Sequence, residues 1–127
     1  MTTVPDAPPQ TLLLVDDDDD IASAYTRALE RAGWAVHRAR TGTEALALAA
    51  GMAVLHAAMV DLVLPGVGGL DVVRGLRLSH PACLIVAVTG LPAPSVGQAF
   101  RDAGADHFLA KPVDVHALLD ALGGQHS

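Results

Sequence analysis

Four short apolar runs in this chain each end in a polar residue of a reactive type. Uninterrupted apolar runs of this length are typical of parallel strands that are buried on both faces of a sheet. The carboxyl ends of parallel strands lie at one edge of the sheet, where ligands bind. We therefore expect a single site made of the residues that end these runs: Asp16 and Asp17 after residues 12–15, Asp61 after residues 57–60, Thr89 after residues 84–88, and Lys111 after residues 108–110.

Helical patterns separate the apolar runs. Apolar residues at helical spacing from Ile21 to Ala32 precede Gly33, and Thr41 and Glu44 have the spacing of a capping box. Five strands that alternate with five helices predict an α/β fold with a parallel sheet. The expected helices begin in the region of residues 18–20, at Thr41, at Leu70 (with Arg74 and Arg77 on the polar face), at Pro94 and at Asp114, and they end near Gly33, Gly51, Leu78, Ala103 and Leu122.

Composition limits the class of protein. The 127 residues suffice for one domain, and a hydrophobic content of 51% with only 3% aromatic residues predicts an aliphatic core. A net charge of −6 argues against direct binding to nucleic acid or to an anionic membrane. The one cysteine, Cys83, lies in an apolar run, so we expect a buried and unpaired thiol. No histidine has the spacing of a zinc site.

Both ends of the chain are polar. Residues 1–10 are rich in proline, and we expect a disordered N-terminal tail there, a domain over residues 11–122 and a short C-terminal tail over residues 123–127. The N-terminus lacks the features of a signal peptide. The longest apolar stretch, Ala45–Val60, contains Gly51 and His56 and is shorter than the ~20 residues of a membrane-spanning helix. These features predict a cytoplasmic protein with no membrane partner.

The aspartate run Asp16–Asp20 allows several interpretations. Most like-charge runs are solvated, and Asp18–Asp20 are interpreted in this way, as the beginning of a helix. An EF-hand calcium loop is excluded, because Ile21 would replace its sixth-position glycine and Arg27 its twelfth-position glutamate. Two carboxylates about 4 Å apart repel by about 4 kcal/mol at an effective dielectric of about 20. Asp16, Asp17 and Asp61 therefore need a cation to lie together, and Mg²⁺ fits their oxygen ligands.

Four segments in order resemble the receiver domain of two-component response regulators, the CheY-like family. These segments are Leu14–Asp17, Val60–Gly66, Val88–Gly90 and Ala103–Pro112, and the resemblance extends from Thr11 to about Leu122. It implies a flavodoxin-like, doubly wound (βα)5 fold, a three-layer sandwich around a parallel sheet of order 2-1-3-4-5. It also implies a cis peptide bond before Pro112.

The resemblance further implies roles for the residues of the site. Asp61 would be the phosphoacceptor, which takes a phosphoryl group from a sensor histidine kinase or a histidine phosphotransfer protein. Asp17, Asp61 and the Val63 backbone carbonyl would bind Mg²⁺ directly, and Asp16 would hold the ion through water. Lys111 would pair with the phosphoryl oxygens.

Thr89 would turn toward the new phosphoryl group, and Phe108 would be the aromatic switch residue that turns inward as Thr89 moves. On this basis we expect a phosphorelay switch and not a turnover enzyme. The chain would carry no output domain, so an unknown output protein would dock on the fourth helix, fifth strand and fifth helix.

Two apolar residues depart from what the family often has beside the site. Val63 lies two residues after Asp61, and Leu91 lies two residues after Thr89. Polar side chains at these positions can orient the water that hydrolyses an acyl phosphate, and neither valine nor leucine can form such a hydrogen bond. We therefore expect a long-lived phosphorylated state.

Three alternatives remain. The chain could be a receiver cut from a larger hybrid kinase or response regulator. It could be a phosphohydrolase with an aspartyl-phosphate intermediate, in which Asp16 is the nucleophile and Asp18 the acid, although Asp61 would then have no role. It could also be a degenerate receiver that only binds a partner, although Asp61, Thr89 and Lys111 are all present.

Overall fold

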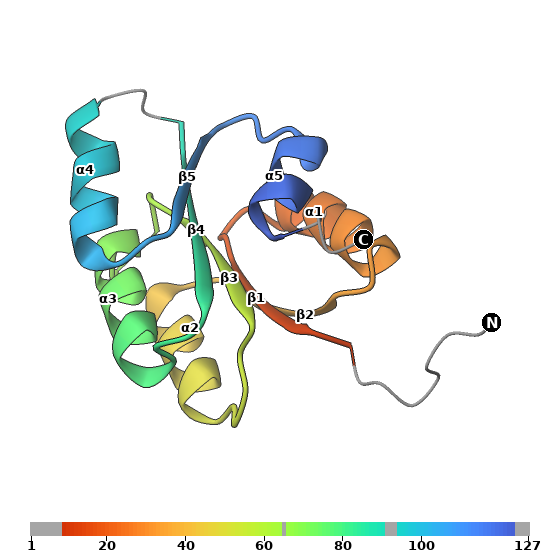
Figure 1. The fold of residues 1–127 in the computed structure, drawn as a ribbon, viewed down its shortest axis with the longest axis horizontal. Coiled ribbons are helices and arrows are strands. Elements are labelled where there is room, and N and C mark those ends of the chain that lie inside the picture. Colours follow the sequence, from red (N-terminus) through yellow and green to blue (C-terminus); the bar gives the residue numbers. More distant parts are fainter. Residues whose placement is uncertain (1–8, 65, 91–93, 124–127) are drawn as a thin grey trace.

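A five-stranded parallel sheet lies between two layers of helices (Figure 1). The computed structural model describes residues 9–64, 66–90 and 94–123. Both expected tails fall largely outside this part of the chain, as does Leu91, so the domain boundaries remain predictions. In chain order the elements are β1 (Thr11–Val15), α1 (Asp19–Arg31), β2 (Ala35–Ala39), α2 (Gly42–Ala50), β3 (Ala57–Asp61), α3 (Gly69–Ser79), β4 (Leu84–Thr89), α4 (Pro94–Ala103), β5 (His107–Ala110) and α5 (Val115–Ala121).

The strand order β2-β1-β3-β4-β5 confirms the order that the family resemblance implies. All four strand pairs are parallel. Val15, the last residue of β1, pairs with Ala39 on one side and with Val60 on the other. The residues that follow β1 and β3 therefore lie next to each other at the carboxyl edge of the sheet.

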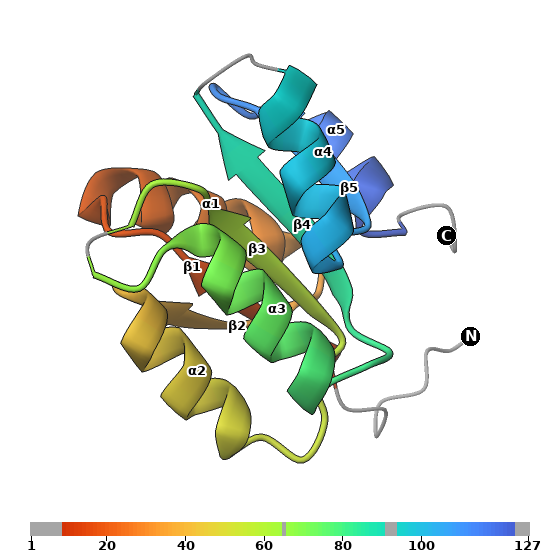
Figure 2. The same ribbon diagram turned by 90° about the vertical axis from the view of Figure 1, so that its left-hand side faces the viewer.

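Helices cover both faces of the sheet, as a three-layer sandwich requires. Helices α2, α3 and α4 pack side by side on one face, and α1 and α5 pack on the other (Figures 1 and 2). Alternate residues of a strand point to opposite faces. Leu13 and Val15 of β1 accordingly lie in the core under α2–α4, whereas Leu12 and Leu14 lie in the core under α1 and α5.

Polar side chains begin three of the helices as the sequence predicts. Asp18 caps α1 by accepting from the Ile21 N–H (3.0 Å), and Asp114 accepts from the His116 N–H at the start of α5. Thr41 accepts from the Glu44 N–H (3.1 Å) before α2. The reciprocal half of the capping box differs, because the Glu44 carboxylate accepts from the Arg40 N–H and not from that of Thr41.

Arg77 corrects one expectation from the helical pattern. Arg74 is exposed and pairs with Asp71, as a residue on the polar face should. Arg77, by contrast, folds over the amino end of β4 and donates to the carbonyl oxygens of Pro81, Cys83 and Gly104 and to the Asp106 carboxylate. Several backbone carbonyls would otherwise lack donors there, so the long guanidinium side chain is drawn inward.

Cys83 is buried and forms no disulfide, as predicted, and burial raises the pKa of its thiol to about 11. In the part of the chain that the structure describes, no helix combines the length and the apolar character needed to cross a lipid bilayer.

Candidate phosphoacceptor and metal site

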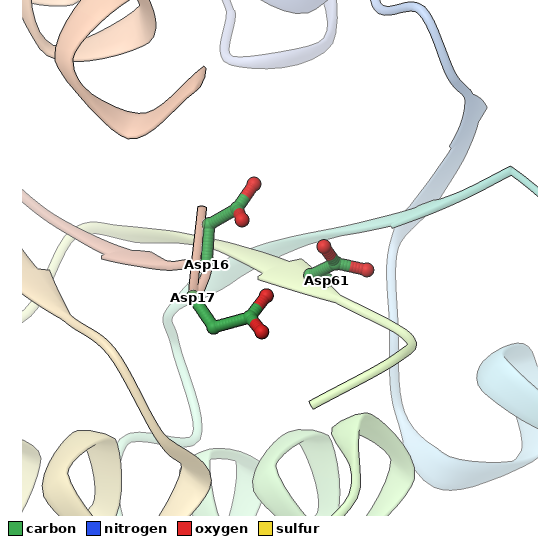
Figure 3. A group of neighbouring side chains, drawn as sticks. All are labelled: Asp16, Asp17 and Asp61. Carbon is green, nitrogen blue, oxygen red and sulfur yellow. The ribbon is translucent and has the colours of Figure 1, made fainter. Parts of the chain in front are cut away.

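Three aspartates meet at the carboxyl edge of the sheet, as expected. Asp16 and Asp17 leave the end of β1, and Asp61 is the last residue of β3 (Figure 3). One carboxylate oxygen from each residue lies within 4.8 Å of the other two. Asp16 and Asp61 are only 3% and 4% exposed, whereas Asp17 is open to solvent. Carboxylate oxygens that are partly buried and partly open to solvent suit a hard divalent cation that keeps several waters.

The Asp61 carboxylate accepts two hydrogen bonds, one from the Lys111 ammonium and one from the Val63 backbone N–H. Lys111 Nζ lies 2.5 Å from Asp61 Oδ2, and the Val63 N–H donates to Asp61 Oδ1 at 3.0 Å. Lys111 itself is fixed through its backbone, because its N–H donates to the Thr89 carbonyl at 2.7 Å. The Lys111–Pro112 peptide bond is cis, which confirms that expectation.

Burial and neighbouring charges shift the pKa values of Asp16 and Lys111. Burial raises the pKa of Asp16 above its ordinary value, and the charge of Asp61 adds to this effect, although the Asp18 N–H opposes it by donating to Asp16 Oδ1 (2.9 Å). Burial alone would lower the pKa of Lys111, but the hydrogen bond and charge of Asp61, with the charge of Asp16, outweigh burial and raise it. Asp16 therefore holds a proton more tightly than an isolated aspartate would.

Thr89 and Phe108 lie on the adjacent strands β4 and β5. Thr89 ends β4 and is fully buried, and its carbonyl binds the Lys111 backbone. Phe108, in β5, is half-buried and its ring centroid lies 5.7 Å from that of Phe100 in α4. β4 and β5 are paired so that Ala87 faces Phe108 and Thr89 faces Ala110. Thr89 and Phe108 therefore lie on neighbouring strands, two residues apart in register.

The side chains of Val63 and Asp18 do not belong to the group of three carboxylates. The Val63 side chain is 64% exposed beside Asp61, so an apolar surface borders the site. Asp18, the acid of the hydrolase alternative, is occupied as the N-cap of α1. Asp19 and Asp20 lie in the first turn of α1, as the interpretation of the aspartate run predicted.

Arg38 contacts the site, although the sequence pattern gave no sign of it. This β2 residue donates to the Asp16 carbonyl through Nε (3.0 Å) and Nη2 (2.7 Å), and through Nη1 to Asp19 (2.9 Å). The Arg38 hydrogen bond is the main reason why the pKa of Asp19 is lowered. A basic residue on an edge strand is usually solvated, and only the pairing of β2 with β1 brings it to the acidic loop.

Residues 12–123 match the family model of the response regulator receiver domain, and the chain therefore belongs to this family. It is 37% identical to the photosynthetic apparatus regulatory protein RegA of Cereibacter sphaeroides over 96 residues, which are 76% of this chain and 52% of that protein. The chain thus spans about half the length of this relative.

Solved receiver structures share the fold. A response regulator from Burkholderia pseudomallei, described with a phosphorylated aspartic acid, calcium ion and citrate, is 34% identical with a TM-score of 0.84, over 89% of this chain and 66% of that one. A CheY-like receiver domain from Methanospirillum hungatei is 28% identical with a TM-score of 0.86, over 92% of this chain and 93% of that one. Family and fold together define this chain as a receiver domain of two-component systems, a signalling switch.

Proposed function

We propose that Asp61 of this receiver accepts a phosphoryl group in a Mg²⁺-dependent reaction. The observation that carries the proposal is the meeting of three carboxylates at the ends of β1 and β3 (Figure 3), one of which accepts from the Lys111 ammonium. Carboxylates this close repel one another unless cations neutralise them. Three carboxylates, one ammonium and one divalent cation are electrically neutral together, so an incoming phosphate would not be repelled.

The donor set suits the ion that the resemblance implies. Two oxygens bound to one Mg²⁺ at about 2.1 Å are at most about 4.2 Å apart. The three carboxylates lie within 4.8 Å of one another, which is close to this limit, so one ion could join them. By the family resemblance, Asp17, Asp61 and the Val63 carbonyl would bind the ion directly, and Asp16 would hold it through water. When bound, Mg²⁺ would neutralise charge on the phosphoryl group and hold it in line for transfer.

In the transfer step, a carboxylate oxygen of Asp61 attacks phosphorus. A new O–P bond forms as the P–N bond to the phosphohistidine of the donor breaks, and the departing imidazole takes up a proton. The donor would be a sensor histidine kinase or a histidine phosphotransfer protein. Lys111, paired with Asp61 Oδ2 before transfer, would move to the phosphoryl oxygens, where a charge-assisted hydrogen bond is strong.

Thr89 and Phe108 would transmit the phosphorylated state from the site to the surface of the domain. The Thr89 hydroxyl would donate to a phosphoryl oxygen, and Phe108 would turn inward as Thr89 moves. Phe108 is only half-buried and contacts Phe100 of α4, so this motion would alter the surface of α4, β5 and α5. An output partner in the cytoplasm would bind to this surface.

Labelling by a small acyl phosphate tests the proposal directly. The wild-type chain should gain one phosphoryl group in intact-mass spectra when Mg²⁺ is present, and none in the presence of a chelator. Asp61→Asn keeps the size of the side chain but removes the nucleophile, so it should not be labelled. Labelling that persists in Asp61→Asn but disappears in Asp16→Asn, with continuous release of phosphate, would favour the hydrolase instead.

A further inference from the structure

Arg38 forms three hydrogen bonds to the segment that carries Asp16 and Asp17. Two of them converge on the Asp16 carbonyl and the third reaches Asp19, the first residue of α1. The guanidinium is largely covered, with 24% of the side chain exposed. Its planar fork can bind a carbonyl and a carboxylate at once, and the single ammonium of a lysine cannot reproduce this geometry.

Asp17 has fewer contacts of its own than Asp16 has. Asp16 is fixed at three points: its N–H donates to the Ala39 carbonyl (3.1 Å), its carboxylate accepts from the Asp18 N–H, and its carbonyl accepts from Arg38. Within residues 9–64, 66–90 and 94–123, by contrast, the Asp17 carboxylate has no hydrogen-bond or ion-pair partner. Its position is therefore set by the backbone, and the Asp16 carbonyl belongs to the peptide unit that joins Asp16 to Asp17.

We propose that Arg38 is a positioning residue for divalent-cation binding. Its guanidinium fixes the Asp16–Asp17 peptide unit so that the Asp17 carboxylate faces Asp61, which preorganises the ligands before the ion arrives. This inference rests on the proposed function, because it assigns Arg38 to the Mg²⁺ site. It concerns the affinity for the ion and not the phosphoryl transfer itself.

Charge and positioning make opposite predictions for the loss of Arg38. Arg38 is a cation beside an acidic site, so its charge alone disfavours Mg²⁺, and removal of the charge should tighten ion binding. If positioning dominates, removal should weaken ion binding, since loss of a group that orients a metal ligand typically costs about 10–100-fold in affinity. The sign of the change therefore separates the two effects.

Arg40 offers a matched control. It carries the same charge and also pairs with Asp19, with 2.7 Å between Arg40 Nη2 and Asp19 Oδ1, but no contact joins its side chain to Asp16 among the described residues. Arg40→Ala removes one positive charge near the same loop and leaves all three Arg38 hydrogen bonds in place. Its Mg²⁺ affinity should be unchanged or slightly increased.

The experiment is a calorimetric Mg²⁺ titration of wild type, Arg38→Ala, Arg38→Lys and Arg40→Ala, with no phosphodonor present. We expect binding to be about tenfold weaker in Arg38→Ala, weakened in Arg38→Lys despite the retained charge, and not weakened in Arg40→Ala. Equal or tighter binding in Arg38→Ala would overturn the inference. A lower melting temperature with unchanged Mg²⁺ affinity would also overturn it, because Arg38 would then serve stability alone.

Amide exchange in the metal-free protein provides a second readout. The Asp18 N–H, which bonds to Asp16 Oδ1, should exchange faster in Arg38→Lys than in wild type, and unchanged exchange would contradict the inference. If Arg38→Ala does not fold, Arg38→Lys, which keeps the charge, decides the question by the same titration. Absence of Mg²⁺ binding in wild type would refute the proposed metal site itself, which is a different outcome from binding that Arg38 does not affect.

Discussion

Lys111 and Asp61 form an ion pair that joins β5 to β3 across the intervening strand β4. The distance between Lys111 Nζ and Asp61 Oδ2 is 2.5 Å, the aspartate is 4% exposed, and Lys111 is the only lysine in the sequence. A buried carboxylate that loses its cation partner is costly, because its charge is left uncompensated beside Asp16. The pair therefore contributes to stability as well as to the proposed chemistry.

Lys111→Ala should destabilise the metal-free protein by about 2 kcal/mol, less than loss of a fully buried pair because 27% of the lysine side chain is exposed. Urea unfolding in the presence of a chelator measures this change. The double variant Lys111→Ala/Asp61→Asn should recover part of the loss, since it removes the unpaired charge. Additive losses in the double variant would show that the two side chains are not energetically coupled.

The raised pKa of Asp16 predicts a dependence of stability on pH. A carboxyl whose pKa is higher in the folded state than in the unfolded state stabilises the fold below its ordinary pKa of 3.8, and this contribution is lost as the pH rises through the folded-state pKa. In the presence of a chelator, wild type should therefore lose stability relative to Asp16→Asn as the pH rises from about 4 toward neutral.

Urea unfolding of both proteins across this range, with and without Mg²⁺, measures the effect. The amide oxygen introduced by Asp16→Asn would still be able to accept from the Asp18 N–H, so the variant tests charge and not the loss of that hydrogen bond. Mg²⁺ should reverse the ranking near neutral pH, because the ion binds the carboxylate of wild type. A difference in stability that is constant across the range would contradict the raised pKa.

Gly69 should tolerate no side chain. A Cβ atom at this position would lie 2.5 Å from the Asp61 carbonyl oxygen and 2.9 Å from Leu62 Cα, and this backbone can move only by displacing Asp61. Gly69→Ala should lower the free energy of unfolding by about 1–3 kcal/mol and weaken Mg²⁺ binding. Thermal unfolding and ion titration provide the two measurements.

The adjacent Gly68 provides the control. A Cβ atom there meets nothing within 4 Å, and the backbone φ of −76° suits alanine. Gly68→Ala loses some preference for the N-cap position but also reduces the entropy of the unfolded chain, so its net effect should be within about 0.5 kcal/mol of zero. Equal effects at both positions would rule out the steric explanation.

Val63 should set the lifetime of the phosphorylated form. Its exposed apolar side chain borders Asp61 and can orient no water. Val63→Gln should shorten the lifetime by about tenfold, below the roughly 10²–10⁴-fold effect of a well-placed general acid or base. Val63→Ile should leave it unchanged. Intact-mass spectra after removal of the phosphodonor follow the decay, and decay of wild type within seconds would contradict the expected long lifetime.

The meeting of the site's side chains at one edge of the sheet was predictable, because it depends on topology. Asp16, Asp17, Asp61, Thr89 and Lys111 each follow or end an apolar run, and parallel strands bring such ends together whatever their order. The order 2-1-3-4-5 itself came from the family resemblance, since hydrophobic periodicity shows which faces are buried but not which strands are neighbours.

Arginines show where prediction from the sequence fails. Arg38, Arg74 and Arg77 are equally polar along the chain, but only Arg74 remains on an exposed surface. Arg38 and Arg77 turn inward because backbone carbonyls from distant segments need donors there. Such needs arise only after the strands are paired and the helices are packed, so no local pattern reveals them.

The scarcity of ε-amino groups has a practical consequence. In this polypeptide, reagents that acylate primary amines can modify only Lys111 and the α-amino group. Coupling to a sensor chip through amines, or cross-linking with a succinimidyl ester, would therefore act on the salt-bridged lysine itself. Surface attachment should use another chemistry, whereas slow acylation of Lys111 offers a direct report on whether its partner carboxylate is engaged.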